Sequence, residues 1–268
     1  MDYIKYIILG LIQGITEPLP VSSSGHVFLF KNLFNSESLF NSFNFEIISN
    51  FASFLAILFI FRKDVIKLIK DFFGFIFGKN KESYKIGFSY VIKMIISTIP
   101  VGIAGVLLND YLESHFNSVK LLGFAFLFTA LMLYLVRNIK GEKGDADITY
   151  KDAIIIGLFE MITIIPGISR SGTVLVACLI CKLKRETALK YTFMLYFPVS
   201  LGTMLLKVPN LLSTESSLIL PYASGFIVAL IVTYFSYNWL SNFVKKGKLW
   251  KFSIYCLCLA LFIFIYFR

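Results

Sequence analysis

Long apolar runs separated by short polar links dominate the pattern of this chain. A helix needs about 20 mostly apolar residues to cross the hydrocarbon core of a bilayer. Six runs approach or exceed that length, at about 43–61, 86–108, 119–136, 187–206, 218–240 and 250–267. The pattern therefore predicts an all-α integral membrane protein in which residues 1–268 form a single membrane domain.

Two further apolar stretches, at about 3–34 and 153–181, are interrupted near their middles. Proline and a Ser-rich turn break the first stretch at 17–25 and the second at 166–172. Each half is too short to cross a bilayer, and broken helices at membrane depth are tolerated where they line a cavity. We expect each stretch to form a re-entrant helical hairpin beside six full transmembrane helices.

The composition fits a membrane protein, because 57% of the residues are hydrophobic and 16% are charged, against about 25% charged in soluble domains. The net charge of +10 comes mostly from Lys and Arg in the short links. Such links are typical of the cytoplasmic side of membrane proteins. The charge therefore does not indicate a nucleic-acid partner, and the bilayer with its anionic headgroups is the expected partner.

The basic links also predict how the chain is threaded through the membrane. Links rich in Lys and Arg are expected inside, and they lie at 62–85, 137–151, 182–190 and 245–251. The link at 109–120 is acidic and is expected outside. The second broken stretch then enters from the cytoplasmic side, and the first enters from the external side.

The two broken stretches are related by an internal repeat. A shift of 147 residues (157 − 10) places 10–25 on 157–172. Seven positions are then identical: Gly10/Gly157, Leu11/Leu158, Ile15/Ile162, Thr16/Thr163, Ser22/Ser169, Ser24/Ser171 and Gly25/Gly172. Three predicted spans separate the copies, and an odd number inverts the second copy. We predict inverted repeats at roughly 1–136 and 153–268, with a site at their interface.

The first hairpin concentrates polar side chains where hydrocarbon is expected. Gln13 and Glu17 are four residues apart and share one face of a helix. They can hold a divalent cation together, or Glu17 can act as a general base. The serines at 22–24 precede a new helix, and N–H groups at a helix start bind phosphate readily. His26 can give or take a proton near neutral pH.

The second hairpin places Arg170 between Ser169 and Ser171 at the matching turn. An arginine at bilayer depth costs about 2.5–3.5 kcal/mol on insertion scales, so it should have an anionic partner. Its planar fork fits a phosphate group. A lone polar residue in a membrane helix is more often structural, but the combination repeated with inversion favours a phosphate site. Its residues suit either hydrolysis or transport.

At these residues the chain resembles a known family. The run QGITEPLPVSSSGH at 13–26 resembles the first signature of the undecaprenyl-diphosphate phosphatase (bacitracin-resistance) family, and PGISRS at 166–171 resembles the second. The resemblance covers essentially the whole chain. It implies hydrolysis of undecaprenyl diphosphate to undecaprenyl phosphate and inorganic phosphate, which recycles the lipid carrier of cell-wall synthesis. It also implies a plasma-membrane location, a divalent cation (Mg²⁺ or Ca²⁺), and a site open to the external face.

The resemblance also implies roles for individual residues. The implied catalytic residues are Glu17, Ser23, His26 and Arg170, with substrate contacts at Ser22, Ser24, Ser169, Ser171 and Thr173, and metal ligands at Glu17 and Gln13. Either Ser23 or His26 is the expected nucleophile. The chain departs from the family pattern at Gln13, where an acid is usual, at Pro18, and at Val174, where Thr is usual.

Two other function classes fit the same residues. A polyprenyl-phosphate flippase or transporter would bind the headgroup with the same arginine and serines, without cleaving it. A carrier that couples a small anion to an ion gradient is a third candidate. Release of inorganic phosphate separates the phosphatase from both. A homodimer is a further expectation for this chain.

Overall fold

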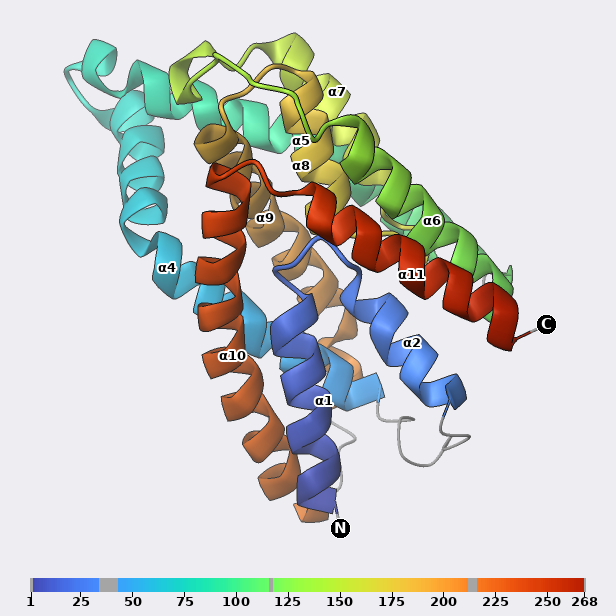
Figure 1. Ribbon diagram of the computed structural model, residues 1–268. Coiled ribbons are helices and arrows are strands. Elements are labelled where there is room, and N and C mark those ends of the chain that lie inside the picture. The colour runs from blue at the N-terminus through green and yellow to red at the C-terminus, as the bar shows by residue number, and fades with distance from the viewer. Residues whose placement is uncertain (1, 34–42, 116–117, 212–215, 268) are drawn as a thin grey trace.

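The computed structural model describes residues 2–33, 43–115, 118–211 and 216–267. Within these ranges the chain has ten α-helices, so the predicted all-α class is confirmed (Figure 1). They are α1 (Asp2–Thr16), α2 (Ser23–Leu33), α4 (Phe43–Phe77), α5 (Lys81–His115), α6 (Val119–Leu135), α7 (Tyr150–Ile162), α8 (Arg170–Ile180), α9 (Arg185–Leu211), α10 (Ile219–Lys245) and α11 (Trp250–Tyr266). Short 3-10 helices lie in the links at Asp145–Asp147 and Ser216–Leu218.

The six predicted spans all fall in helices, but these helices differ in length and polarity. Among the described residues, three segments are long and apolar enough to cross a membrane: Asn44–Phe77, Lys81–Leu108 and Ile219–Lys245. α6 and α11 have 17 residues each, or about 26 Å of helix. α9 is longer, but it begins with charged residues. The chain is therefore an integral membrane protein of the all-α class.

The basic link predicted at 62–85 is mostly helical. α4 continues to Phe77 and α5 begins at Lys81, so only 78–80 separate the two helices. Apolar residues between 65 and 75 recur at helical spacing and pack on α5, where the Phe75 and Phe88 rings stack with 4.2 Å between centroids. The basic side chains stay exposed on the outside of this helical pair. Residues 116–117 of the predicted external link, and 34–42 after α2, lie outside the described residues.

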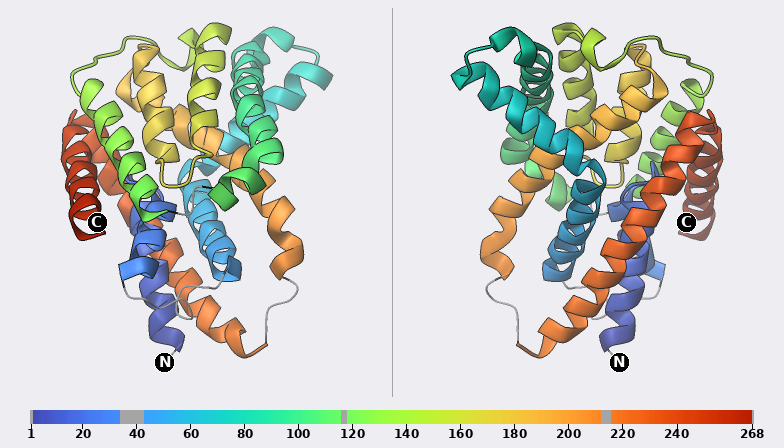
Figure 2. Two further views of the ribbon diagram at one scale, coloured as in Figure 1. Left: turned by 90° about the vertical axis from the view of Figure 1, so that its right-hand side faces the viewer. Right: turned by 90° about the vertical axis from the view of Figure 1, so that its left-hand side faces the viewer.

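The two broken stretches form two helix pairs that meet at their tips. α1 and α2 are joined by a turn at 17–22, and α7 and α8 by a turn at 163–169. Figure 2 shows the α7–α8 pair and the α1–α2 pair approaching each other from opposite ends of the molecule. At the tips, Ser171 Oγ donates a hydrogen bond of 2.9 Å to the Leu19 carbonyl. Around them, α1 packs along α10 and α11 along α6 (Figure 1).

Glycine is required at the tip of the second pair. Gly167 has φ +89°, and a Cβ there would lie 2.6 Å from Leu122 Cδ1 of α6. A left-handed backbone favours glycine, and the close approach of α6 leaves no room for a side chain. The turn therefore stays packed on α6, where Leu122 and Phe126 are buried. This contact helps to set the depth at which Arg170 begins α8.

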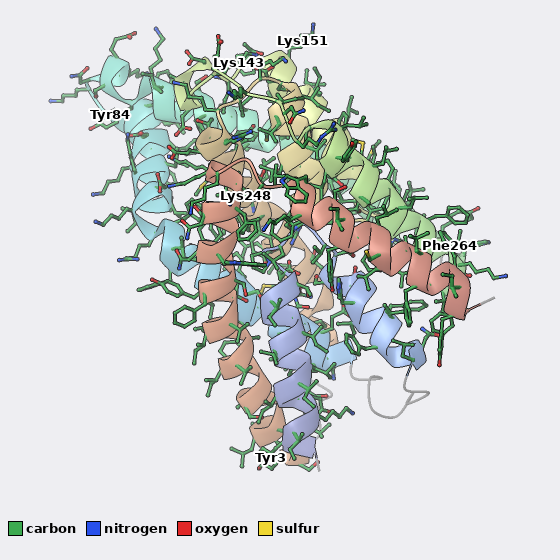
Figure 3. All side chains as sticks on the ribbon, in the orientation of Figure 1. Tyr3, Tyr84, Lys143, Lys151, Lys248 and Phe264 are labelled. Atoms are coloured by element: carbon green, nitrogen blue, oxygen red, sulfur yellow. The ribbon has the colours of Figure 1, made fainter. Side chains whose placement is uncertain are left out.

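Charged links gather at one end of the molecule. Lys143 and Lys151 lie at that end, and Tyr3 lies at the opposite end (Figure 3). Lys190 forms ion pairs there with Asp64 at 2.6 Å and Asp145 at 2.9 Å. These two pairs tie α4 and α9 to the link that precedes α7. One end of the molecule thus carries the basic links and the Lys190 ion pairs, and this charge makes it different from the opposite end.

Candidate active site

Each tip carries a serine that caps the following helix. Ser22 Oγ accepts a hydrogen bond of 3.1 Å from the Gly25 N–H, and Ser169 Oγ accepts one of 3.2 Å from the Gly172 N–H. Such caps satisfy one of the free N–H groups at a helix start. Ser22 also takes a left-handed φ of 67°, a strained conformation that clusters at functional sites. The repeated residues therefore build the same cap twice, on two sides of one cavity.

Glu17 is the centre of a hydrogen-bond network between the tips. Its Oε1 accepts a bond of 2.9 Å from Arg170 Nη2, and its Oε2 accepts one of 2.5 Å from Ser23 Oγ. Gln13 Nε2 donates to the same Oε2 at 3.0 Å from one turn earlier in α1. The Glu17 side chain is 9% exposed and that of Arg170 is 27% exposed, so limited water contact strengthens their attraction. The structure brings these four predicted residues together.

Three residues outside the predicted set hold this network in place. Asn50 Oδ1 of α4 accepts a hydrogen bond of 2.7 Å from Gln13 Nε2. The Arg170 guanidinium lies over the Tyr196 ring, with 4.4 Å from Cζ to the centroid. Arg170 Nη1 also donates to Ser200 Oγ at 3.5 Å. Tyr196 and Ser200 are four residues apart on one face of α9, and that polar spacing inside an apolar run is the sequence signal for them.

The Glu17 network lines a cavity of about 970 Å³ formed by α1, α2, α4, α5, α9 and the α7–α8 pair. Serines from both tips line it beside the Glu17 network: Ser22, Ser23, Ser24, Ser169 and Ser171. Apolar side chains form its remaining walls, among them Val101, Val106, Ile164, Val199 and Leu205. The cavity therefore combines hydroxyls and a guanidinium at its centre with hydrocarbon around them, which suits an amphipathic phosphate ligand.

His26 and Thr173 do not belong to the residues that line this cavity. His26 is 4% exposed, with Nδ1 at 2.7 Å from the Ser22 carbonyl oxygen and Nε2 at 2.7 Å from the Tyr255 hydroxyl. Both ring nitrogens are therefore bound to partners other than Glu17, and the ring is parallel to that of Tyr255 on α11. Thr173 is 1% exposed inside α8. The structure places His26 as a support for the first tip and Thr173 in the packed interior.

The ligands for a divalent cation are only partly supplied by the protein. Among the described residues, no three His, Cys, Asp or Glu side chains form a group that could hold a metal. Glu17 binds Arg170, and Gln13, Glu46 and Asn50 add further oxygens around the same cavity. Mg²⁺ typically uses one or two carboxylates and keeps water and substrate phosphates as its other ligands. The residues present fit a cation that is bound together with a diphosphate.

The residue of the second hairpin that corresponds to Gln13 is not placed to bind a cation in the cavity. Glu160 occupies that place in the internal repeat, but it is 1% exposed and is not among the cavity-lining residues. Neither of its carboxylate oxygens has a hydrogen-bond partner among the described residues. The two hairpins thus differ in chemistry, since the first supplies the carboxylate and the second supplies the guanidinium.

Comparison with known proteins gives relatives of nearly the same length. The chain is 43% identical over 265 residues to Undecaprenyl-diphosphatase 1 of Bacillus cereus, covering 98% of this chain and 97% of that protein. It is 41% identical over 267 residues to Undecaprenyl-diphosphatase of Oceanobacillus iheyensis, covering 98% and 96%. It is also 41% identical over 272 residues to Undecaprenyl-diphosphatase 1 of Bacillus licheniformis, covering 99% and 100%.

A family match extends over the same region. The family described as bacitracin resistance protein BacA matches residues 6–262, which include most of α1, all of α2, α7 and α8, and every residue of the Glu17 network. With this match and the full-length relatives, the chain belongs to the bacitracin resistance protein BacA family.

Proposed function

We infer that this chain is a membrane phosphatase that hydrolyses undecaprenyl diphosphate to undecaprenyl phosphate and inorganic phosphate. The hydrogen bond of 2.5 Å between Ser23 Oγ and Glu17 Oε2 carries this inference. A transporter needs only groups that bind phosphate, whereas a hydroxyl held on a carboxylate is what a nucleophile and its base require. Relatives named undecaprenyl-diphosphatase support hydrolysis over a flippase. The product is the lipid carrier used again in cell-wall synthesis.

Substrate binding changes the partner of Arg170. A diphosphate headgroup offers oxygens that the guanidinium fork can bind in pairs. The Ser169 hydroxyl and the first N–H groups of α8 add further donors, whereas the Ser171 hydroxyl donates to the Leu19 carbonyl. Arg170 then shares its charge between the phosphate and Glu17. Tyr196 keeps the guanidinium at the site throughout, by its stacking contact.

The chemical step uses Ser23 and Glu17. Glu17 Oε2 takes the proton of Ser23 Oγ as that oxygen attacks the terminal phosphorus. The bond from this phosphorus to the bridging oxygen breaks, and undecaprenyl phosphate leaves with the electron pair. Water then attacks the phosphoserine, its protons stay with the released phosphate, and Glu17 returns its proton to Ser23. Most of the rate in such transfers comes from positioning and charge neutralisation.

A divalent cation, Mg²⁺ or Ca²⁺, remains part of the proposal. Glu17 and Gln13 would hold it, together with Glu46 or Asn50 on the facing wall of the cavity. When bound, it would neutralise charge on the diphosphate oxygens. The support for a cation is the set of oxygen atoms in the cavity. Substrate oxygens or water would complete its coordination, because the described residues include no group of three His, Cys, Asp or Glu side chains around one point.

The membrane arrangement follows from helix lengths and from the basic end. α1 and α2 have 15 and 11 residues, and α7 and α8 have 13 and 11. None of them reaches the roughly 20 residues of a spanning helix, which supports re-entrant hairpins beside six spans. The parts of α4 and α5 that line the cavity lie away from the basic ends of these helices, which supports a plasma-membrane site open outside. The repeat boundaries and the homodimer stay predictions.

Release of inorganic phosphate from undecaprenyl diphosphate tests this function. Detergent-purified wild-type protein should release phosphate, and Arg170→Ala should release it about 10³-fold more slowly, since it loses the charge that stabilises the transferred group. Folding of both proteins is checked by size-exclusion chromatography. Lipid binding without any phosphate release by well-folded wild type would contradict the phosphatase and favour the flippase.

A further inference from the structure

The cavity extends from the phosphate-binding residues to the outer surface between α5 and α9. Val106 of α5 and Leu205 of α9 both line the cavity. They are also 72% and 75% exposed. A side chain that lines a cavity and is also largely exposed marks an opening. Both residues are apolar, so this opening lies on a flank that suits contact with lipid.

Three glycines leave this side of the cavity unobstructed. Gly102 and Gly105 of α5 and Gly202 of α9 line the cavity, and a Cβ at any of them would meet nothing within 4 Å. Glycine inside a helix is destabilising relative to alanine, so it needs a local reason. At Gly10 and Gly157 that reason is close contact with the backbone of a neighbouring helix. At these three positions the space is open, and packing does not account for them.

We propose that the gap between α5 and α9 is the binding groove for the prenyl chain of the lipid diphosphate, which enters sideways from the bilayer. This inference rests on the proposed function. The chain is covalently attached to the headgroup bound at Arg170, so it must leave the polar centre along an apolar wall. Val101, Ile164 and Val199 supply such a wall, which is continuous with the phosphate site.

The groove gives the lipid a route to the phosphate site and adds little to the affinity for its prenyl chain. Hydrocarbon gains little by moving from lipid to an apolar protein surface, because lipid tails are as apolar as the side chains. An open flank instead lets a long prenyl chain stay partly in the bilayer while its headgroup reaches Glu17. Val106 and Leu205 lie toward the ends of α5 and α9 away from the basic links. The groove therefore opens toward the external leaflet.

Adding bulk inside the groove tests the proposal. Gly102→Phe and Gly202→Phe place a ring in the gap, whereas Ile103→Phe and Leu201→Phe place one on the adjacent exposed positions outside the cavity lining. Phosphate release is measured with undecaprenyl diphosphate and with farnesyl diphosphate, whose chain is much shorter. In the glycine variants, we expect KM for the long substrate to rise about tenfold or more through steric conflict. KM for farnesyl diphosphate, which has far fewer isoprene units to place in the gap, should rise less, and both control variants should match wild type with both substrates.

Each other outcome counts against the groove. An unchanged KM for undecaprenyl diphosphate in both glycine variants overturns it. An equal loss with both substrates also overturns it, because the ring would then block the phosphate site. No release from either substrate by wild type contradicts the proposed function itself, and this proposal falls with it. Gly102→Leu and Gly202→Leu repeat the comparison with a smaller side chain if the Phe variants do not fold.

Discussion

Removing the guanidinium of Arg170 should destabilise the protein as well as inactivate it. Arg170→Gln leaves Glu17 with 9% of its side chain exposed and without its cationic partner. Breaking a fully buried ion pair from one side costs about 3–5 kcal/mol. Arg170 is 27% exposed, so water offsets part of this cost, and we expect a loss of about 2 kcal/mol in the free energy of unfolding.

The double variant makes this prediction specific. Glu17→Gln/Arg170→Gln leaves two neutral amides in place of two charges, so it should be less destabilised than the sum of the single variants. We expect a coupling free energy of about 1–2 kcal/mol between the two positions. Thermal unfolding of all four proteins in one detergent gives the comparison, at about 2–4 °C per kcal/mol for chains of this size class.

A matched control uses an exposed ion pair. Lys85 and Glu82 are 3.2 Å apart with 63% and 81% of their side chains exposed. Glu82→Gln should leave the melting temperature essentially unchanged, because exposed pairs contribute little. Losses at Glu17 and Arg170 that add to within about 0.5 kcal/mol would show no coupling. That result would refute the view that the two tips are held together by this pair.

Three further predictions follow from the site. His26→Gln, which can still donate to the Ser22 carbonyl, should retain more phosphate release than His26→Ala. The pH dependence of phosphate release in His26→Gln should match wild type. Loss of the acidic or the basic limb of that pH profile would contradict a purely supporting role. Ser171→Ala should lower the unfolding free energy by about 1 kcal/mol, because it loses the bond to Leu19, whereas Ser83→Ala in the exposed first helical turn of α5 should not. A chelator should suppress phosphate release and added Mg²⁺ should restore it, so chelator-resistant release would contradict the cation.

The sequence predicts the contact between the two hairpins because each hairpin carries a charged residue inside an apolar stretch, where charges are rare. Glu17 and Arg170 are 153 positions apart, yet each is a charge in an apolar stretch and needs a partner of opposite sign. The caps at Ser22 and Ser169 are local chemistry, set by a serine three residues before a glycine. Both features can be found from the residues alone, since neither depends on how the remaining helices are arranged.

Other parts of the site depend on tertiary packing and leave little trace in the sequence. The orientation of His26 is set by Tyr255, which lies 229 positions later, and nothing near His26 indicates that partner. The apolar spacing within 62–77 is compatible with a continuation of α4. Packing against α5 is what makes this segment helical, and the sequence does not show that contact. Glycine at 102 and 202 is compatible with a kink, a close contact or open space, and the neighbouring helices decide among them.

The most direct test of the proposed chemistry is kcat for phosphate release from undecaprenyl diphosphate in Ser23→Ala and Ser24→Ala. Both serines line the cavity at the start of α2, but Ser23 alone donates to Glu17 among the contacts described for this turn. Loss of a nucleophile should lower kcat by about 10⁴-fold or more, whereas loss of one neutral hydroxyl contact should cost at most about tenfold. Equal losses in the two variants, or wild-type kcat in Ser23→Ala, would contradict catalysis at the Glu17–Ser23 pair.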